Sequence, residues 1–387
     1  MKLGIAKDGG DETRVAIVPG SLKKLVGKGF EVIVEAGAGA RSMVADEAYV
    51  AAGATIGSAA DVRQADLVAS IRRLDPATLA PGAMHVCIAD PFRDTDGIKA
   101  CLERKTTLLA LDMIPRRLSR AQSMDVNSSQ DNLAGYKAVM LGAGELGKVI
   151  PMMTTSAGSV RPAKFVIMGS GVAGLQAIAT AKRLGAVVYA SDVRLAAKEQ
   201  IESVGGRFIH VDGMEDFEDA SGYAKPLTPE FIEKVNGVVN EVASDADVVV
   251  TTARIFGRRA PVTVPASAVE AYKAGAVIVD MNADTGGNCE LTMPGQRHRT
   301  ASGVTVLGFE SLPGLLPQTA SMLFSNNVTN FVTTLVKEDA LHLDLEDPIL
   351  VGPPEGDPLH VPGMGGILVC HDGAIDERQT RLEKVIA

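Results

Sequence analysis

A glycine-rich turn at residues 169–174 (GSGVAG) constrains the fold of this chain more than any other sequence feature. The apolar segment 165–168 runs directly into the turn, and a helical pattern follows it. A second strand-like segment ends at Asp192, about 20 residues onward, which is the spacing of a strand–helix–strand unit. The sequence therefore predicts two parallel strands joined by a helix, with an anion-binding turn at the helix N-terminus.

In such a Rossmann unit the first glycine permits the tight turn, the second lets the backbone approach a pyrophosphate, and the third allows close helix–strand packing. Asp192 would accept hydrogen bonds from the adenosine ribose and repel a 2′-phosphate, which favours NAD(H) over NADP(H). Arg194 leaves the alternative open, since an arginine near that strand end can bind the phosphate instead. We expect the following residues to bind NAD(H): Gly169, Ser170, Gly171, Val172, Ala173, Gly174, Asp192, Val193 and Arg194.

A second match to the glycine pattern, at residues 142–147, has a different context. Its neighbours continue a helical pattern, and no acidic strand end follows at the required distance. We interpret these glycines as small residues on a packed helix.

Strand-like and helix-like segments alternate over most of the chain, which is typical of α/β proteins with parallel sheets. A length of 387 residues exceeds one ordinary core. We expect two Rossmann-like domains with NAD in the cleft between them. The N-terminal domain would comprise residues 1–130, completed by residues 320–387, and the NAD-binding domain residues 131–319.

Individual elements follow from periodicity and from helix start and stop signals. Strands are expected at residues 3–6, 31–35, 66–70, 84–88, 107–111, 164–168, 187–191, 248–252, 276–281, 305–308 and 367–370. Helices are expected at residues 21–28 with a serine cap, 133–153, 172–184, 265–274 and 315–336. The Pro/Gly-rich stretch 351–366 reads as a loop.

Composition excludes several classes of protein. A formal net charge of −9 argues against a nucleic-acid partner, which would need a basic face. Four cysteines stand far apart and form no CxxC pair, so neither a disulfide framework nor a metal site is expected. The N-terminus lacks the apolar stretch of a signal peptide, and no run is long enough for a membrane helix. These features predict a soluble, cytoplasmic protein.

A strongly polar segment, residues 115–130, lies between two apolar elements and holds three arginines, an aspartate and several amides. It would lie at the interdomain cleft, where α/β dehydrogenases place the reacting ring. A solvated loop is the other interpretation that composition allows.

Several motifs identify this segment and its surroundings more specifically: SRAQSMD, SSQDNLAGYKAV, PMMTTSAG, GVAGLQAIATAKRLGAVVYASDVR, GGRF, GYAK, VVVTTA, AGAVIVDMNADTGGNCELT and NNVTNF. Together they resemble the NAD(H)-binding component, or domain I, of proton-translocating nicotinamide nucleotide transhydrogenase, in the alanine dehydrogenase/transhydrogenase family. The resemblance implies direct hydride transfer from NADH to NADP+ held on a partner subunit (the Re/Si-specific reaction), coupled to proton translocation.

By position, the resemblance assigns roles at the nicotinamide end of the nucleotide. Arg117 would contact that end, Gln122 would bridge toward the partner's nucleotide, and Asp125 and Ser128 would orient the carboxamide and ribose. The Gly222-Tyr223-Ala224-Lys225 motif is similar to the family's mobile loop, and Ala253 and Arg254 would complete the cofactor site.

The resemblance also implies partners. These are membrane-embedded and NADP(H)-binding transhydrogenase subunits, expected as separate polypeptides because this chain carries no membrane segment. A homodimer, peripheral on the inner face of the cell membrane, is the implied assembly.

Two alternatives stay open. Alanine dehydrogenase shares the fold and the arginine at Arg14, but its catalytic lysine and histidine positions hold Ser70 and Ile88 here, with His85 close by. Asp284 stands where that enzyme has a catalytic aspartate. A catalytically silent NAD sensor is the third interpretation, and the intact polar segment argues against it.

Overall fold

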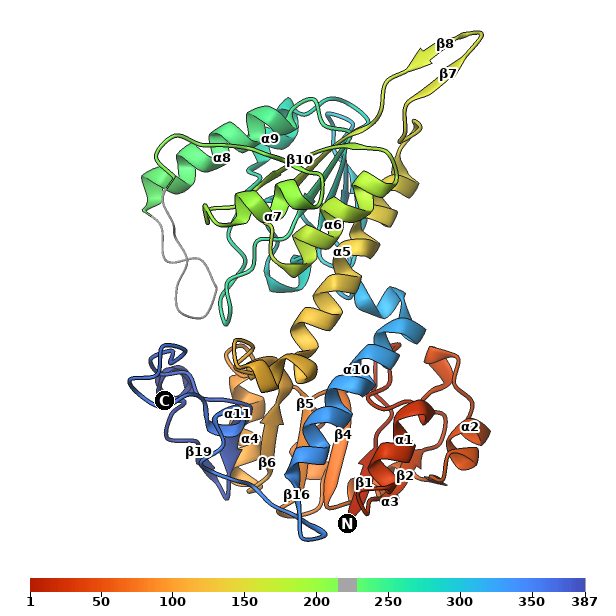
Figure 1. Ribbon diagram of the computed structural model, residues 1–387, viewed down its shortest axis with the longest axis vertical. Coiled ribbons are helices and arrows are strands. Elements are labelled where there is room, and N and C mark those ends of the chain that lie inside the picture. The colour runs from red at the N-terminus through yellow and green to blue at the C-terminus, as the bar shows by residue number, and fades with distance from the viewer. Residues whose placement is uncertain (215–227, 387) are drawn as a thin grey trace. The chain divides into compact units, whose positions relative to one another are not determined.

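The computed structural model describes residues 1–214 and 228–386, which form two compact units (Figure 1). The first unit combines Met1–Gln130 with Leu316–Ala387, and the second is Asp131–Leu315. The chain therefore leaves the first unit after Gln130 and returns to complete it.

The first unit is built on an eight-stranded sheet in the order β19-β18-β6-β5-β4-β1-β2-β3. The strands are β1 Lys2–Ile5, β2 Glu31–Glu35, β3 Thr55–Gly57, β4 Leu67–Arg72, β5 Met84–Ile88, β6 Thr107–Ala110, β18 Leu368–His371 and β19 Ala374–Ile375. Strands β1 to β6 pair in parallel, whereas β18 is antiparallel to both β6 and β19. The C-terminal segment thus supplies an edge of the N-terminal sheet.

The described helices of this unit are α1 Pro19–Val26, α2 Asp46–Ala51, α3 Ala59–Arg63, α4 Thr95–Glu103, α10 Pro317–Val332, α11 Pro348–Val351 and α12 Thr380–Ile386. A short hairpin follows α10, formed by β16 Val336–Lys337 and β17 Ala340–Leu341. Phe324, Val328 and Phe331 of α10 are fully buried in the same apolar core as the central strands, so α10 is an integral part of this core.

The second unit holds a seven-stranded sheet in the order β11-β10-β9-β12-β13-β15-β14. Its strands are β9 Lys164–Met168, β10 Val187–Ser191, β11 Arg207–Phe208, β12 Val248–Thr251, β13 Val277–Asp280, β14 Arg297–Arg299 and β15 Thr305–Leu307. All pairs are parallel except that of β14 with β15. Because β9 is central and the order reverses between β9 and β12, this is the doubly wound Rossmann topology.

Its described helices are α5 Val126–Glu145, which starts in the first unit, α6 Val172–Arg183, α7 Ala197–Ser203, α8 Pro229–Ala243 and α9 Ala266–Ala271. A hairpin, β7 Met153–Thr155 with β8 Gly158–Val160, extends away from the rest of this unit with exposed side chains (Figure 1). The central strands are buried on both faces, which explains why they read as continuous apolar runs.

The predicted α/β class with parallel-rich sheets is confirmed, and most strands lie within a residue or two of their expected places. Two helix predictions are wrong in detail. Helix α1 has no serine cap: Pro19 occupies its first position, which suits a residue without an N–H, and Ser21 lies inside it, where its hydroxyl accepts from Ser325.

The helix expected at 133–153 begins earlier and ends earlier, as α5 Val126–Glu145. It starts at Val126 because Asp125 accepts the backbone N–H of Ser128, as an N-cap residue does. Gly142 lies inside α5, where an added Cβ would come 2.7 Å from Cγ1 of Val248, so the helix approaches the sheet closely at this glycine. The second glycine match is therefore a packing feature, as expected.

Within the described part of the chain, no helix combines the length and apolar character needed to cross a bilayer. In residues 1–214 and 228–386, the structure also shows no group of three or more His, Cys, Asp or Glu side chains placed to hold a metal ion.

Candidate functional site

The turn between β9 and α6 gives each of its glycines a different environment. Gly169 has φ +98°, and an added Cβ would lie 2.5 Å from Oγ1 of Thr252. A Cβ on Gly174 would lie 2.0 Å from the carbonyl oxygen of Gly169, so only glycine lets the helix start against the turn. A Cβ on Gly171 would meet nothing within 4 Å. The first and third glycines thus serve the fold, whereas Gly171 leaves open space at the N-terminus of α6.

Asp192, after the end of β10, is bound to this turn. Its Oδ2 accepts from the backbone N–H and the hydroxyl of Ser170, both at 2.8 Å. Val172 and Ala173 follow in the first turn of α6. The acidic strand end and the glycine turn therefore form one hydrogen-bonded unit, and the backbone amides of α6 begin beside it.

Arg194 folds back onto the same carboxylate. Its backbone N–H and Nε donate to Oδ1 at 3.0 and 2.9 Å, and a terminal nitrogen donates to Oδ2 at 2.9 Å. Burial alone would raise the pKa of Asp192, but the hydrogen bonds and charge of Arg194 hold that pKa below its ordinary value. The carboxylate is ionised and its acceptor positions are occupied, so a ribose hydroxyl can reach Asp192 only if an Arg194 donor gives way.

The other cofactor residues expected in this unit lie nearby or outside the described chain. Ala253 follows β12, and its carbonyl accepts from the side-chain amides of Asn282 and Asn288 at 3.1 and 2.8 Å. Arg254 is exposed and lies 3.9 Å from Asp284. Val193 is half-buried between Asp192 and Arg194. Gly222 and Tyr223 fall outside the described residues.

In the first unit, the polar segment 115–130 is not the irregular loop that its composition allows. Residues Ser119–Met124 form a 3-10 helix, and the residues from Val126 onward belong to α5. Asp125 is buried and accepts from the backbone and hydroxyl of Ser128 at 2.9 and 2.6 Å. Asp125 and Ser128 therefore shape the start of α5, while the side chains of Arg117 and Gln122 are exposed.

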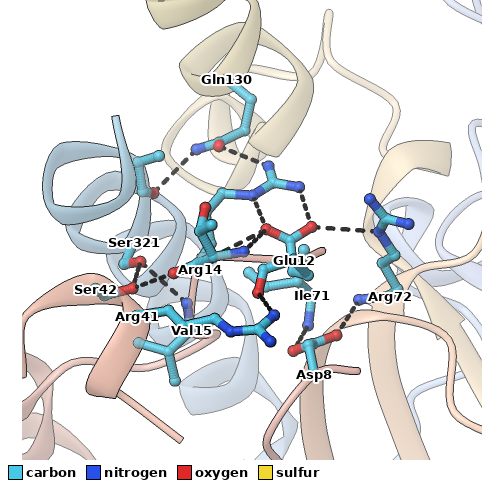
Figure 2. Close-up of polar contacts among 12 residues, drawn as sticks. Asp8, Glu12, Arg14, Val15, Arg41, Ser42, Ile71, Arg72, Gln130 and Ser321 are labelled. Carbon is cyan, nitrogen blue, oxygen red and sulfur yellow. Dashed lines mark hydrogen bonds and ion pairs between the residues drawn. The ribbon is translucent and has the colours of Figure 1, made fainter. Parts of the chain in front are cut away.

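A buried charge cluster, which the sequence analysis did not predict, lies behind this segment (Figure 2). Glu12, with a fully buried side chain, accepts from Nε and a terminal nitrogen of Arg14 at 2.7 and 2.8 Å. The remaining terminal nitrogen of Arg14 donates to Gln130 at 2.9 Å, and Arg72 contacts Glu12 at 3.3 Å. Arg14 is thus already neutralised and oriented. The run of alternating charges at residues 7–14 was the available sequence signal.

Asp8, at the edge of the same cluster, accepts the backbone N–H groups of Ile71 and Arg72 at 2.9 and 2.8 Å (Figure 2). Burial raises its pKa to about 6, and the two backbone hydrogen bonds only partly oppose that effect. Asp8 therefore joins the end of β1 to the end of β4 and titrates closer to neutrality than an ordinary aspartate.

Ser70 and His85 are fully buried and bonded to each other. The Ser70 hydroxyl donates to the carbonyl of Arg72 at 2.5 Å and lies 2.8 Å from Nε2 of His85. Because that hydroxyl has one proton, Nε2 of His85 must be the donor in their contact. Burial lowers the pKa of His85 to about 3, so the imidazole is neutral and enclosed. Ile88 ends β5 and carries no titratable group.

Comparison with known proteins agrees with this arrangement. Family models described as "Alanine dehydrogenase/PNT, N-terminal domain" and "Alanine dehydrogenase/PNT, C-terminal domain" match residues 5–134 and 138–353. The first of the polypeptides that make up the NAD(P) transhydrogenase alpha subunit of Rhodospirillum rubrum is 45% identical over 370 residues, which cover 91% of this chain and 95% of that protein.

Two further relatives bracket the similarity. A transhydrogenase from Sinorhizobium meliloti has a crystal structure with TM-score 0.80 and 38% identity, covering 97% of this chain and 98% of that one. The alanine dehydrogenase of Mycolicibacterium smegmatis is 27% identical over 342 residues, which cover 84% of each protein. The similarity to transhydrogenase subunits is thus clearly the stronger of the two.

Proposed function

The chain belongs to the alanine dehydrogenase/PNT family, and from that premise we propose that it is the NAD(H)-binding component of a proton-translocating NAD(P)+ transhydrogenase. It holds NADH, whose hydride passes directly to NADP+ held on a partner subunit. The partner subunits embed in the membrane and couple the transfer to proton movement. The chain works as a homodimer, peripheral on the inner face of the cell membrane.

The observation that carries this choice within the family is the state of the acid–base positions. An amino-acid dehydrogenase must move protons as well as a hydride, and it needs a titratable group at the substrate. Here the lysine position holds Ser70, whose proton is committed to a backbone carbonyl, and the histidine position holds Ile88. Hydride transfer between two nucleotides needs no such group.

The paired state of Arg14 supports the same choice. A substrate carboxylate would require free guanidinium donors, but the Arg14 donors face Glu12 and Gln130. Binding an amino acid there would break a buried ion pair, which is costly. The arginine common to both families is therefore a structural group in this chain.

The two units divide the nucleotide between them in this proposal. The turn from Gly169 to Gly174 and the ionised Asp192 serve the pyrophosphate and adenosine ribose, and the carboxylate selects against a 2′-phosphate. The segment bearing Arg117 and Gln122 serves the nicotinamide end, with its backbone shaped by Asp125 and Ser128. The chain contributes positioning and exclusion of water rather than acid–base chemistry.

Two measurements test the proposal. Isothermal titration calorimetry should show NADH binding at least tenfold tighter than NADPH, and equal affinity would contradict the assignment of Asp192. Mixed with an NADP(H)-binding transhydrogenase component, the chain should support reduction of an NAD+ analogue by NADPH. Robust turnover of alanine with NAD+ by the chain alone would instead establish an amino-acid dehydrogenase.

A further inference from the structure

The backbone beside Gln122 is held from one helix, α10, by two asparagine amides. Nδ2 of Asn327 donates to the carbonyl oxygen of Ser123 at 2.9 Å. Nδ2 of Asn330, one turn further along α10, donates to the same oxygen at 3.0 Å. Ser123 directly follows Gln122 in the 3-10 helix Ser119–Met124. Both amides therefore meet at a single carbonyl, in the segment proposed to serve the nicotinamide.

The chemistry of the neighbours settles the orientation of both amides. A carbonyl can only accept, so each asparagine must turn its NH₂ group toward Ser123. On the opposite side, Oδ1 of Asn327 accepts from the hydroxyl of Ser129 at 2.7 Å. Oδ1 of Asn330 accepts from Nζ of Lys24 at 2.7 Å, and an ammonium can only donate. Neither amide can flip without losing both of its contacts.

The Ser123 carbonyl needs such partners because of where it lies. It belongs to the last turn of a 3-10 helix, and carbonyls at a helix C-terminus have no partner inside the helix. A carbonyl oxygen has two lone pairs, and the two amides can occupy both. The interaction therefore satisfies the end of the 3-10 helix from outside.

Asn327 also joins the 3-10 helix to the start of α5. Its Nδ2 holds Ser123 on one side of Asp125, and its Oδ1 holds Ser129 on the other. Asp125 caps α5 between these two points through the backbone and hydroxyl of Ser128. One side chain thus constrains both ends of the segment that turns from the 3-10 helix into α5.

Helix α10 is a rigid support for these contacts. Its apolar side is fully buried, and its Ser321 and Ser325 hydroxyls accept the backbone N–H groups of Val15 and Val18 at 3.0 Å each. Asn327 and Asn330 are three residues apart and so lie on the same side of the helix. A side chain carried by a fully packed helix transmits little movement to the group it holds.

We propose that Asn327 and Asn330 are positioning residues for hydride transfer, which hold the backbone at Ser123 so that Gln122 lies in place beside the reacting ring. This inference rests on the proposed function. Neither asparagine needs to touch the nucleotide. Because transfer between two bound rings depends on distance and alignment, a displacement of about 1 Å in this segment can cost about a hundredfold in rate.

The test uses isosteric changes, Asn327→Asp and Asn330→Asp, which remove the amide donor and keep the shape of the side chain. The exposed neighbour Asn326→Asp is the matched control, because it adds the same charge to the same helix. With the full chain and an NADP(H)-binding component, each test variant should lower the hydride-transfer rate about tenfold, and the double variant about a hundredfold. The NADH dissociation constant should change less than about twofold, since a loss of fold would weaken binding as well.

Two further readouts separate positioning from a general structural effect. Asn330→Gln, at a half-buried site, keeps an amide donor and should recover part of the rate. Hydrogen exchange of the peptide spanning residues 115–125 should accelerate in the aspartate variants and stay unchanged in Asn326→Asp.

The outcomes are distinguishable. Slower transfer with unchanged NADH affinity, seen in the test variants and not in the control, supports the inference. If the original chain transfers hydride and both test variants match its rate, the positioning role is wrong and the proposed function stands. If the original chain binds NADH but transfers no hydride with a competent partner, the proposed function fails and the positioning role fails with it.

Discussion

The buried Glu12–Arg14 pair should make the first unit depend strongly on one carboxylate. Replacing Glu12 with Gln keeps the shape of the side chain but removes the charge opposite Arg14. The side chains of Glu12 and Arg14 are 0% and 8% exposed, so water cannot compensate the guanidinium that is left. Removing one partner of a buried pair costs about 3–5 kcal/mol. The new amide would also direct a donor at the donors of Arg14 or Arg72, which already point at Glu12.

The second unit offers a matched control at the surface. Arg297 donates to both oxygens of Glu145 at 2.9 and 2.7 Å, the same two-point geometry. That arginine is 56% exposed and the glutamate 26%, so water and salt screen the pair. Glu145→Gln should leave unfolding of its unit unchanged within error. Similar geometry in the two pairs isolates burial as the variable.

Urea unfolding with pulsed hydrogen exchange and mass spectrometry reads the two units separately, through peptides covering β4 and β13. Glu12→Gln should lower the unfolding free energy reported by the β4 peptide by about 3–5 kcal/mol. Adding Arg14→Met to Glu12→Gln should restore part of the loss, because the uncompensated charge is then gone. A loss below about 1 kcal/mol, or an effect no larger than that of Glu145→Gln, would refute the reasoning.

Three other predictions follow from the geometry. Gly174→Ala should destabilise the second unit by about 1–3 kcal/mol because its Cβ would lie 2.0 Å from a backbone oxygen, whereas Gly171→Ala should leave the urea midpoint unchanged and weaken NADH binding in calorimetry; equal behaviour of the two would contradict the distinct roles of these glycines. Asp192→Asn should weaken NADH binding about tenfold and narrow the preference over NADPH, and unchanged affinities would remove Asp192 from the site. The pKa of Asp8 is raised from 3.8 to about 6 by folding, so its contribution to stability is complete below pH 3.8 and is lost as pH rises through 6, a change on the order of 3 kcal/mol; the unfolding free energy of the first unit should lose this pH dependence in Asp8→Asn, and an identical pH profile in the variant would exclude Asp8 as its source.

Much of the second unit was predictable because its signals are local. A buried parallel strand reads as an apolar run, and the glycines of the turn respond to clashes within a few residues or with the adjacent strand. Asp192 follows from its spacing to the turn. The same reasoning missed the contact of Arg194 with Asp192, since a side chain that can bind either a carboxylate or a phosphate reveals its choice only in the folded chain.

In the first unit, sequence patterns found the polar segment but not its shape. Composition could not distinguish a solvated loop from the observed 3-10 helix followed by a capped α5, because serine, aspartate and asparagine favour both turns and helix caps. The functional interpretation of Asp125 and Ser128 came from resemblance, and their bond to each other appeared only in the structure.

The sequence alone determined that this chain has a Rossmann unit, where its nucleotide-binding turn lies, and which family it resembles, because each rests on residues close together in the chain. Only the tertiary structure decided what Arg14, Ser70 and the asparagines of α10 do. Arg14 is neutralised by Glu12, Ser70 is enclosed with His85, and Asn327 reaches a carbonyl 204 positions away. A polar group's role is set by the partners that burial brings to it, and those partners lie too far apart in the chain for any local pattern to record them.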